Sequence, residues 1–345
     1  MIEPKSGDVL RADAEALVNS VNCVGVMGRG VALQFRKAFP ENYEAYRKVC
    51  DRKELRPGTV FVHDLNRLTN PRYVINFPTK EHWKAKSRIE DIETGLGALV
   101  REVRARKIRS IAMPPLGCGL GGLRWAKVKP LIEEAFRKVP DVRVLLYQPK
   151  GAPPPEQMAK RRKTPSMSVS RAALVALANR YLAAVMDPIV TLLELHKLLY
   201  FLQESGESLR LRYEKATFGP YAENLRHLLN EIEGHFIEGF GDAGDQPGKP
   251  IRLDSQASAQ AEVYLERYPR TRERFERVVR LIAGFETPFG MELLATVHWV
   301  TKYEKAETAE EAVAKTYAWN NRKRMFQETH IRKAWERLER QGWLG

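Results

Sequence analysis

The segment from Met113 to Trp125 holds four glycines within six residues, at positions 117, 119, 121 and 122. It follows a short apolar run and precedes a stretch with a helical pattern. Glycine is used where the backbone adopts a positive φ or approaches another group closely. Between a strand and a helix, such a loop offers unpaired backbone N–H groups and a helix N-terminus to an anion. We therefore expect a phosphate cradle here, with a tight turn as the alternative.

A second glycine-containing loop lies between Asn19 and Ala32. Asn22 falls where the preceding strand should end, and its side-chain amide can bind a ligand hydroxyl. Gly28 and Gly30 lead into a predicted helix. Loops at the carboxyl ends of parallel strands open onto one crevice, where open α/β sheets bind ligands. Neither loop has the spacing of a P-loop or of a dinucleotide-binding fingerprint, which disfavours those two nucleotide sites.

Lys80 is the third candidate, because it follows the apolar run Tyr73–Phe77 directly after Pro78 and Thr79. A free lysine has a pKa of ~10.4 and is a poor nucleophile while protonated. Desolvation and cationic neighbours lower that pKa, whereas a bound diphosphate raises it. The alternative is a surface charge that closes a strand. Glu81 and His82 are weaker candidates, which we expect to be loop residues.

Asp8 is a fourth polar candidate, since it follows Gly7 near the N-terminus. Its carboxylate could accept a hydrogen bond from an exocyclic amine. An ordinary turn aspartate explains the same pattern.

The elements that must position these residues follow from the hydrophobic pattern of the first half. Short apolar runs predict strands at 16–21, 59–63, 73–77, 108–113 and 142–147. Amphipathic runs predict helices at 30–39, 87–106 and 125–139, and a turn or helix at 41–50. Strands rich in Val and Ile that alternate with helices indicate an α/β sheet covered on both faces. This arrangement puts both glycine loops and Lys80 at strand ends.

The second half has a different period. From Ser170 onward, apolar residues recur every three to four positions, which predicts a mostly helical domain with a break at 239–250. The stretch 151–168, rich in Pro, Lys and Arg, predicts a linker. We therefore expect domains at 1–150 and 169–345. The basic run Lys160–Lys163 is either a solvated hinge or a nucleic-acid contact.

The net charge of the chain indicates which classes of binding partner it favours. The 345 residues carry a formal net charge of +14. Residues 1–150 hold 28 Lys and Arg against 17 Asp and Glu, while residues 151–345 hold 29 against 26. The basic first half favours a polyanionic partner, because each neutralised phosphate releases counterions; a solvated basic surface is the alternative.

The three cysteines lack the spacing of metal ligands, so we expect no disulfide framework, no metal and no cofactor. The chain has no apolar run of membrane-spanning length and no apolar signal region at its start. These features predict a cytoplasmic location without a membrane partner.

Four motifs together give the first half a specific resemblance: Gly7–Val9, Val18–Asn22, Gly28–Ala32 and Pro115–Leu120. They resemble the macrodomains, which have a three-layer α/β/α fold and bind ADP-ribose. The resemblance implies that Asp8 meets the adenine amine and that the two glycine loops wrap the diphosphate and the distal ribose. The ADP-ribose-binding residues that it implies are Asp8, Val9, Asn22, Met27, Gly28, Arg29, Gly30, Val31, Thr79, Pro115, Gly117, Cys118, Gly119, Leu120, Gly121 and Gly122.

The resemblance also points to catalytic residues. One hydrolase branch of the macrodomains carries an aspartate in the first loop, but residues 28–31 of this chain have no carboxylate. The stretch from Tyr73 to Lys80 is instead similar to the terminal ADP-ribose glycohydrolases, in which a lysine after a strand attacks the anomeric carbon. That branch has an aspartate where this chain has Gly121. The resemblance thus implies that Lys80 is catalytic, that Asn22 orients the distal ribose, and that the acid/base partner is absent or comes from substrate or water.

In the second half, Leu195–Phe201 and Phe218–Tyr221 resemble the helical antitoxin module called Panacea. Taken as residues alone, they read as core positions followed by a turn. Between Phe201 and Pro247, nine acidic residues face four basic ones. Such a surface either mimics nucleic acid in a partner's groove or is a solvated helix face.

Together, the two halves resemble the DarG-type antitoxins over essentially the whole chain. The resemblance implies a glycohydrolase that removes ADP-ribose from thymidine in single-stranded DNA and releases ADP-ribose. It also implies that the helical half binds the cognate DarT-type ADP-ribosyltransferase toxin.

Three alternatives remain open at this point. The first half could hydrolyse ADP-ribose from glutamate on proteins. It could also bind ADP-ribose as a reader without chemistry, as the missing carboxylate at Gly121 permits. Finally, the helical half could restrain a toxin by binding alone.

Overall fold

The computed structural model describes residues 1–149, 158, 164–241 and 243–344. The chain divides into two compact units, the first covering Met1–Arg162 and the second nearly all of the remaining chain. The predicted linker at 151–168, with its basic run, falls largely outside the described residues. The helical part of the second unit starts at Val169, where the side chain of Ser168 caps the first helix.

The first unit is built on a six-stranded sheet with the order β1-β6-β5-β2-β4-β3. Its strands run parallel except β3, which pairs antiparallel with β4 at the edge. The strands are β1 (Ile2–Lys5), β2 (Ala16–Val21), β3 (Phe61–Asp64), β4 (Tyr73–Pro78), β5 (Ser110–Met113) and β6 (Arg143–Tyr147). A short 3-10 helix, η1 (Val9–Arg11), follows β1.

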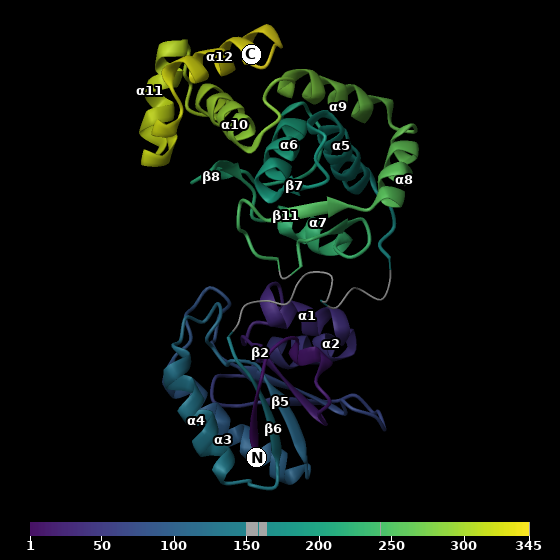
Figure 1. The fold of residues 1–345 in the computed structure, drawn as a ribbon, viewed down its shortest axis with the longest axis vertical. Coiled ribbons are helices and arrows are strands. Elements are labelled where there is room, and N and C mark those ends of the chain that lie inside the picture. Colours follow the sequence, from purple (N-terminus) through teal and green to yellow (C-terminus); the bar gives the residue numbers. More distant parts are fainter. Residues whose placement is uncertain (150–157, 159–163, 242, 345) are drawn as a thin grey trace. The chain divides into compact units, whose positions relative to one another are not determined.

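Helices cover both faces of this sheet. Side chains alternate between the two faces along each strand, so a strand of consecutive apolar residues presents apolar groups to helices on both sides. Val18 packs in a cluster with α3 (Ile89–Ala105) and α4 (Trp125–Arg137), whereas its neighbour Leu17 packs in a cluster with α1 (Gly30–Ala38). The helix α2 (Pro40–Asp51) follows α1 and packs on it. Figure 1 shows α3 and α4 together on one side of β5 and β6. The three-layer α/β/α prediction is confirmed.

The predicted elements of the first unit are all present, with bounds shifted by a few residues. The strand β1 is an addition that the pattern did not predict. It has four residues, includes Pro4 and lies at a sheet edge, where proline is tolerated because one side of the strand needs no donor. Its partner β6 is 142 residues away, as in the pair Glu3–Leu145, so no local pattern in the sequence predicts the pairing.

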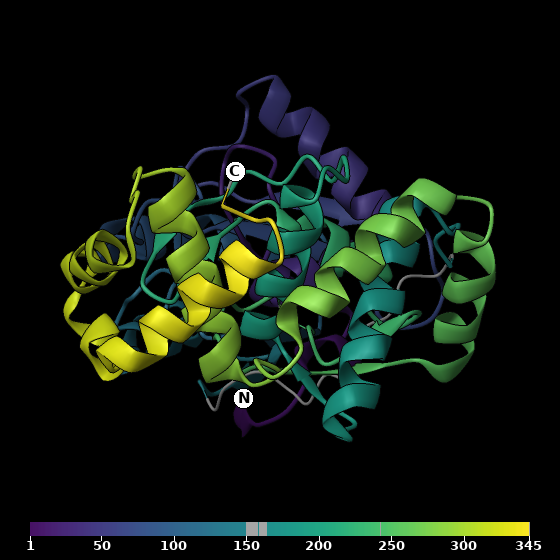
Figure 2. The same ribbon diagram turned by 90° about the horizontal axis from the view of Figure 1, so that it is seen from above.

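The second unit is mostly helical, as predicted. Its helices are α5 (Val169–Val185), α6 (Leu192–Glu204), α7 (Leu225–Ile232), α8 (Ser255–Leu265), α9 (Pro269–Ile282), α10 (Pro288–Lys302), α11 (Ala309–Trp319) and α12 (Glu328–Arg340), with the 3-10 helix η3 (Asn321–Met325) before α12. Seen from above, the yellow α12 lies across α10, while α8 and α9 lie toward the opposite side of this unit (Figure 2).

Short strands interrupt the helices of the second unit. Strands β8 (Glu214–Ala216) and β9 (Gly219–Tyr221) form a hairpin, and β7 (Val190–Thr191), β10 (Ile237–Glu238) and β11 (Pro250–Leu253) form a small sheet. The predicted break at 239–250 is the segment between β10 and β11. None of the helices among the described residues is long and apolar enough to cross a membrane.

Candidate active site

Three segments leave the carboxyl ends of the neighbouring parallel strands β5, β2 and β4. They are the second glycine loop (114–124), the first glycine loop (22–29) and a segment that we call the strap (79–88). Backbone hydrogen bonds tie them together: the Cys23 amide donates to the Glu81 carbonyl at 2.9 Å, and the Ser87 amide donates to the Gly121 carbonyl at 3.0 Å. The structure therefore brings both glycine loops and Lys80 to one place.

Lys80 lies at the start of the strap and points at the second glycine loop. Its ammonium nitrogen Nζ donates to the carbonyl of Trp83 at 3.1 Å and to the carbonyl of Leu120 at 3.4 Å. Burial lowers the pKa of Lys80, because desolvation penalises the charged amine. No carboxylate of the described residues forms an ion pair with it. The amine is therefore easier to deprotonate than an ordinary surface lysine.

Gly121 leaves no space for a side chain. A Cβ atom built there would lie 2.2 Å from Ser87 Oγ and 2.4 Å from the carbonyl oxygen of Gly117. The second contact is with backbone, so a different rotamer cannot relieve it. The loop conformation itself thus excludes the aspartate found here in related hydrolases, and Lys80 has no carboxylate partner from this position.

Several backbone donors in the two glycine loops have no partner among the described residues. The amides of Gly119, Leu120 and Gly121 donate to no other described residue. At the start of α1, the amides of Gly30 and Val31 belong to the first turn, where helical N–H groups lack intrahelical partners. Two sets of unpaired donors in neighbouring loops are suited to an anion with two phosphate groups.

Asn22 makes most of its hydrogen bonds within the first glycine loop. Its Oδ1 accepts hydrogen bonds from the amides of Val24 at 3.0 Å and Val26 at 3.3 Å, and its Nδ2 donates to the Val26 carbonyl at 2.6 Å. The buried Tyr46 of α2 donates its hydroxyl to the Asn22 carbonyl at 2.7 Å. Asn22 therefore holds the first glycine loop in shape, and one N–H of its amide remains for a ribose hydroxyl.

Other predicted ligand residues are distributed between the loops and the core. Thr79 is buried, with its Oγ1 3.0 Å from Ser20 Oγ. The side chain of Met27 is fully buried in the cluster of Tyr46 and Cys50, so only its backbone can contact a ligand. Gly28 and Arg29 precede α1, while Pro115, Gly117, Cys118 and Gly122 shape the second glycine loop.

Asp8 and Val9 lie apart from the three segments, in the turn after β1. The Asp8 carboxylate accepts from the Leu10 amide at 3.0 Å and caps η1. Burial raises the pKa of Asp8, while the Leu10 amide opposes that shift. Val9 is a core residue beside Phe35 of α1. This turn packs on α1, the helix that begins after the first glycine loop. A ligand whose diphosphate lies at that loop could therefore extend along α1 to the turn.

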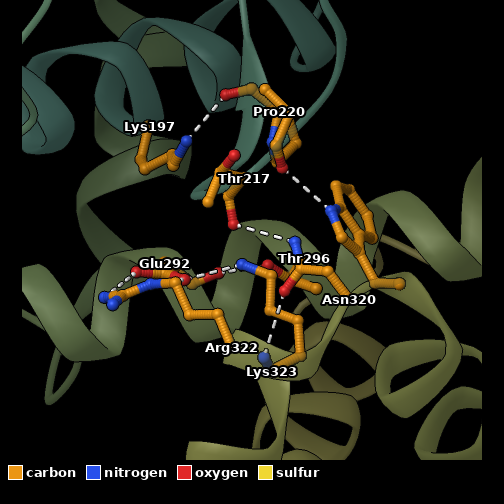
Figure 3. Close-up of polar contacts among 10 residues, drawn as sticks. Lys197, Thr217, Pro220, Glu292, Thr296, Asn320, Arg322 and Lys323 are labelled. Atoms are coloured by element: carbon orange, nitrogen blue, oxygen red, sulfur yellow. Dashed lines mark hydrogen bonds and ion pairs between the residues drawn. The ribbon is translucent and has the colours of Figure 1, made fainter.

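In the second unit, the structure joins the two halves of the predicted motif. Lys197 on α6 is buried and donates from Nζ to the Pro220 carbonyl at 2.7 Å, and Figure 3 shows this contact. Below it, Glu292 on α10 accepts from Lys323 Nζ at 2.6 Å and from Arg322 at 3.1 and 3.2 Å (Figure 3). These contacts fix the β8–β9 hairpin and η3 to the helices.

The acidic stretch of 201–247 is largely engaged within the unit. Glu207 pairs with Arg274 at 2.8 Å, and Glu204 pairs with Lys302 at 2.6 Å. The carboxylate of Glu233 is buried and accepts from the amides of residues 239–241. An excess of acids in the sequence is therefore not an excess of unpaired acids at the surface, which argues against the nucleic-acid mimic.

Sequence reasoning missed Tyr46, Ser87 and Glu292. The hydroxyl of Ser87 is buried and has no hydrogen-bond partner in the described part of the chain. Tyr46 and Glu292 sit at amphipathic helix positions that pattern alone assigns to the core or to solvent. Their roles come from hydrogen bonds with residues that are 24 positions away in the sequence for Tyr46 and 31 positions away for Glu292.

Comparisons with known proteins show which family and which relatives the chain is similar to. Residues 18–132 match the family described as Macro domain. The chain is 46% identical over 339 residues to the DNA ADP-ribosyl glycohydrolase of Thermus aquaticus, which covers 98% of this chain and 93% of that protein. It is 36% identical over 158 residues to a DNA ADP-ribosyl transferase–DNA ADP-ribosyl glycohydrolase fusion protein of Thermosipho africanus, covering 41% of this chain and 40% of that protein. The solved macrodomain of Mycobacterium tuberculosis DarG is 51% identical, covers 44% of this chain and 99% of that chain, and has a TM-score of 0.43.

Proposed function

We propose a substrate and a mechanism from one premise: the chain belongs to the DarG-type DNA ADP-ribosyl glycohydrolases. It is accordingly an enzyme, a glycosidase that hydrolyses ADP-ribose from DNA. The proposed substrate is thymidine that carries ADP-ribose on N3 within single-stranded DNA. The observation that carries this proposal is the placement of the partly buried Lys80 amine against the second glycine loop.

In the proposed complex, the two sets of loop amides hold the diphosphate and Asp8 meets the adenine amine. The remaining N–H of Asn22 orients the distal ribose. We expect the ligand to contact the two glycine loops, Thr79 and the turn at residues 8–9. Fixing the diphosphate and the ribose contributes mainly by orientation, because it places C1″ within reach of Lys80.

The reaction breaks the bond between C1″ of the ribose and N3 of thymine. The neutral Lys80 amine attacks C1″, and the electron pair of the broken bond goes to N3, which takes a proton from solvent. Water then attacks C1″ and becomes its hydroxyl group, the lysine leaves as a neutral amine, and the second proton of the water returns to solvent before ADP-ribose dissociates. Thymine is a tolerable leaving group because its imide anion is delocalised. Its departure therefore needs less protonation by an acid of the protein than the departure of an ordinary amine would.

A lowered lysine pKa favours this role, because only the deprotonated amine is a nucleophile. A bound diphosphate opposes the effect by stabilising the ammonium form. Hydrogen bonds from the loop amides reduce that opposition, since they satisfy the phosphate oxygens. The absence of a carboxylate at Gly121 also avoids raising the Lys80 pKa, because a nearby negative charge would stabilise the ammonium form.

The substrate class is tested by comparing two substrates at equal concentration. One is a single-stranded oligonucleotide with ADP-ribose on thymine N3, and the other is a peptide with ADP-ribose on glutamate. We expect release of ADP-ribose from the DNA and little from the peptide. Preferential release from the peptide would favour protein hydrolysis, and binding of ADP-ribose without release from either would favour a reader.

We also propose that the second unit binds a DarT-type toxin. The Thermosipho africanus fusion joins a transferase and a glycohydrolase in one polypeptide, which supports a functional pair of these activities. The experiment uses the full chain carrying Lys80→Ala, mixed with the purified toxin and analysed by size-exclusion chromatography. A stable complex is expected, because the substitution lies outside the second unit. Separate elution at micromolar concentrations would overturn this part.

A further inference from the structure

The strap carries a group of side chains that the proposed catalytic mechanism does not use. Residues 81–86 are exposed, in an irregular segment between β4 and α3. Trp83 remains 38% exposed, although a tryptophan at the surface gains nothing from contact with water. The backbone of this same residue touches the reacting amine, because its carbonyl accepts from Lys80 Nζ at 3.1 Å. The Trp83 backbone is therefore next to the Lys80 amine, where the proposed mechanism places C1″ of the substrate, and its side chain is at the surface of the strap.

The surroundings of Trp83 form a small platform of rings and cations. The His82 ring lies 5.3 Å from the indole, centre to centre, and Lys84 Nζ lies 5.0 Å from the ring centre. Lys86 follows two residues later and is exposed. Neither Lys84 nor Lys86 forms an ion pair with any residue in the described ranges, whereas Arg88 lies 3.6 Å from Glu90. The two lysines therefore offer charge that the protein itself does not neutralise.

The second glycine loop also carries an exposed apolar side chain near Lys80. Leu120 is 67% exposed, and its carbonyl accepts from the same Lys80 amine at 3.4 Å. Exposed rings and apolar groups beside unneutralised lysines are the combination that single-stranded nucleic acids require, since bases stack on aromatic faces while phosphates pair with cations. A paired duplex cannot offer its base faces in this way.

We propose that the strap is a binding surface for single-stranded DNA that flanks the modified thymine. Trp83 stacks on an adjacent base, while Lys84 and Lys86 pair with backbone phosphates. This proposal rests on the proposed function and deepens it, because it predicts that the site prefers a modified polymer to the modified nucleoside.

The test compares two substrates that share the scissile bond. One is a single strand of about ten nucleotides with a central ADP-ribosylated thymine, within the footprint of known single-strand binders. The other is the ADP-ribosylated nucleoside. For Trp83→Ala we expect kcat/KM on the oligonucleotide to fall about tenfold further than kcat/KM on the nucleoside, mainly through KM. Trp83→Phe keeps an aromatic face and should retain most of the oligonucleotide activity.

Salt dependence tests the lysines independently. For the double variant Lys84→Gln/Lys86→Gln, the slope of log(1/KM) for the oligonucleotide against log salt concentration should become shallower by about 1.4, which is ~0.7 for each lost phosphate contact on a single strand. An unchanged slope would overturn the assignment of the two lysines.

The outcomes separate the two proposals. Equal loss on both substrates for Trp83→Ala would show that Trp83 only supports Lys80, and an unchanged oligonucleotide rate would show that the strap binds no DNA; either result overturns the strap proposal and leaves the proposed function standing. If the wild-type chain releases ADP-ribose from neither DNA substrate, the proposed function fails and the strap proposal fails with it. Stacking of a protein partner instead would appear as peptide hydrolysis that depends on Trp83.

Discussion

Lys80 and Gly121 define the candidate site at the scale of single residues. The amine of Lys80 is partly desolvated and has only carbonyl oxygens as partners, while the loop conformation leaves no room for a carboxylate at position 121. A nucleophilic lysine benefits from this combination, since an adjacent carboxylate would hold it protonated. The missing acid is thus consistent with lysine chemistry.

The pH profile should carry the signature of this amine. The active form is deprotonated and burial lowers the Lys80 pKa from its ordinary value of 10.5. A lowered pKa means that the proton leaves at lower pH, so kcat/KM in the absence of bound product should rise with pH and level off below pH 10.5. Initial rates across pH 6 to 10 on modified DNA check this, with ADP-ribose binding measured in parallel as the control.

Substitution of Gly121 tests whether the loop excludes an acid. Gly121→Asp should weaken ADP-ribose binding and lower kcat/KM, because the new Cβ collides with the Gly117 carbonyl. Gly119→Ala is the matched control, since a Cβ there meets nothing within 4 Å. The double variant Gly121→Asp/Ser87→Ala should remain impaired, because the backbone collision persists. An active Gly121→Asp enzyme would contradict the observed loop conformation.

At the scale of elements, the site depends on three segments that neighbouring parallel strands bring together. Their positions could be predicted, because short Val- and Ile-rich runs end where Asn22, Lys80 and the second glycine loop begin. The interactions between them could not be predicted. Asn22 looks like a ligand residue from its place at a strand end, yet its amide is used mostly within its own loop.

Other differences between prediction and structure have the same physical origin. Met27 lies in a glycine-containing loop, but its side chain fills the core beside Tyr46. The need for glycine at position 121 comes from Ser87 and the Gly117 carbonyl, and Ser87 is 34 residues away along the chain. The pattern of a sequence reports local period and loop composition, whereas these roles depend on contacts between segments that are distant in sequence.

The hydroxyl of Tyr46 supplies a test of the first glycine loop. Tyr46→Phe removes the donor to the buried Asn22 carbonyl, which should cost about 1–2 kcal/mol of stability and weaken ADP-ribose binding. Tyr43→Phe on the same helix is the control, because the Tyr43 hydroxyl donates to none of the residues in the described ranges. Isothermal calorimetry with ADP-ribose and chemical denaturation measure both effects. Equal stability and equal ADP-ribose affinity of the two variants would show that the Tyr46 hydroxyl does not support the first glycine loop.

At the scale of the whole molecule, the chain combines a catalytic α/β/α unit with a helical unit held by buried charges. Lys197, Glu292 and Lys323 are nearly inaccessible to water, so their interactions are costly to disrupt. They fix the hairpin at 214–221 and η3 against α6 and α10. This network therefore holds these elements of the second unit in one arrangement.

The buried network predicts an asymmetry between two substitutions. Glu292→Gln leaves the fully buried Lys323 without a counter-charge and should cost about 3–5 kcal/mol. Lys323→Met should cost less, because Glu292 keeps the pair of hydrogen bonds from Arg322. Denaturation of the full chain, followed by tryptophan fluorescence, compares them, because four of the six tryptophans lie in the second unit, at 299, 319, 335 and 343. A larger loss for Lys323→Met would contradict the network as described.

We propose that Lys80 carries out the cleavage of ADP-ribose from thymidine in single-stranded DNA. The most direct measurement is the rate of ADP-ribose release from this substrate by the wild-type chain, Lys80→Ala and Lys80→Arg, with ADP-ribose affinity measured for each. Lys80→Arg keeps the positive charge but cannot act as a neutral amine, because its pKa exceeds 12. We predict that both variants lose activity by at least ~100-fold, in the range of a lost proton-transfer or nucleophilic group, while binding ADP-ribose with little change. Near wild-type release by Lys80→Ala would contradict the account.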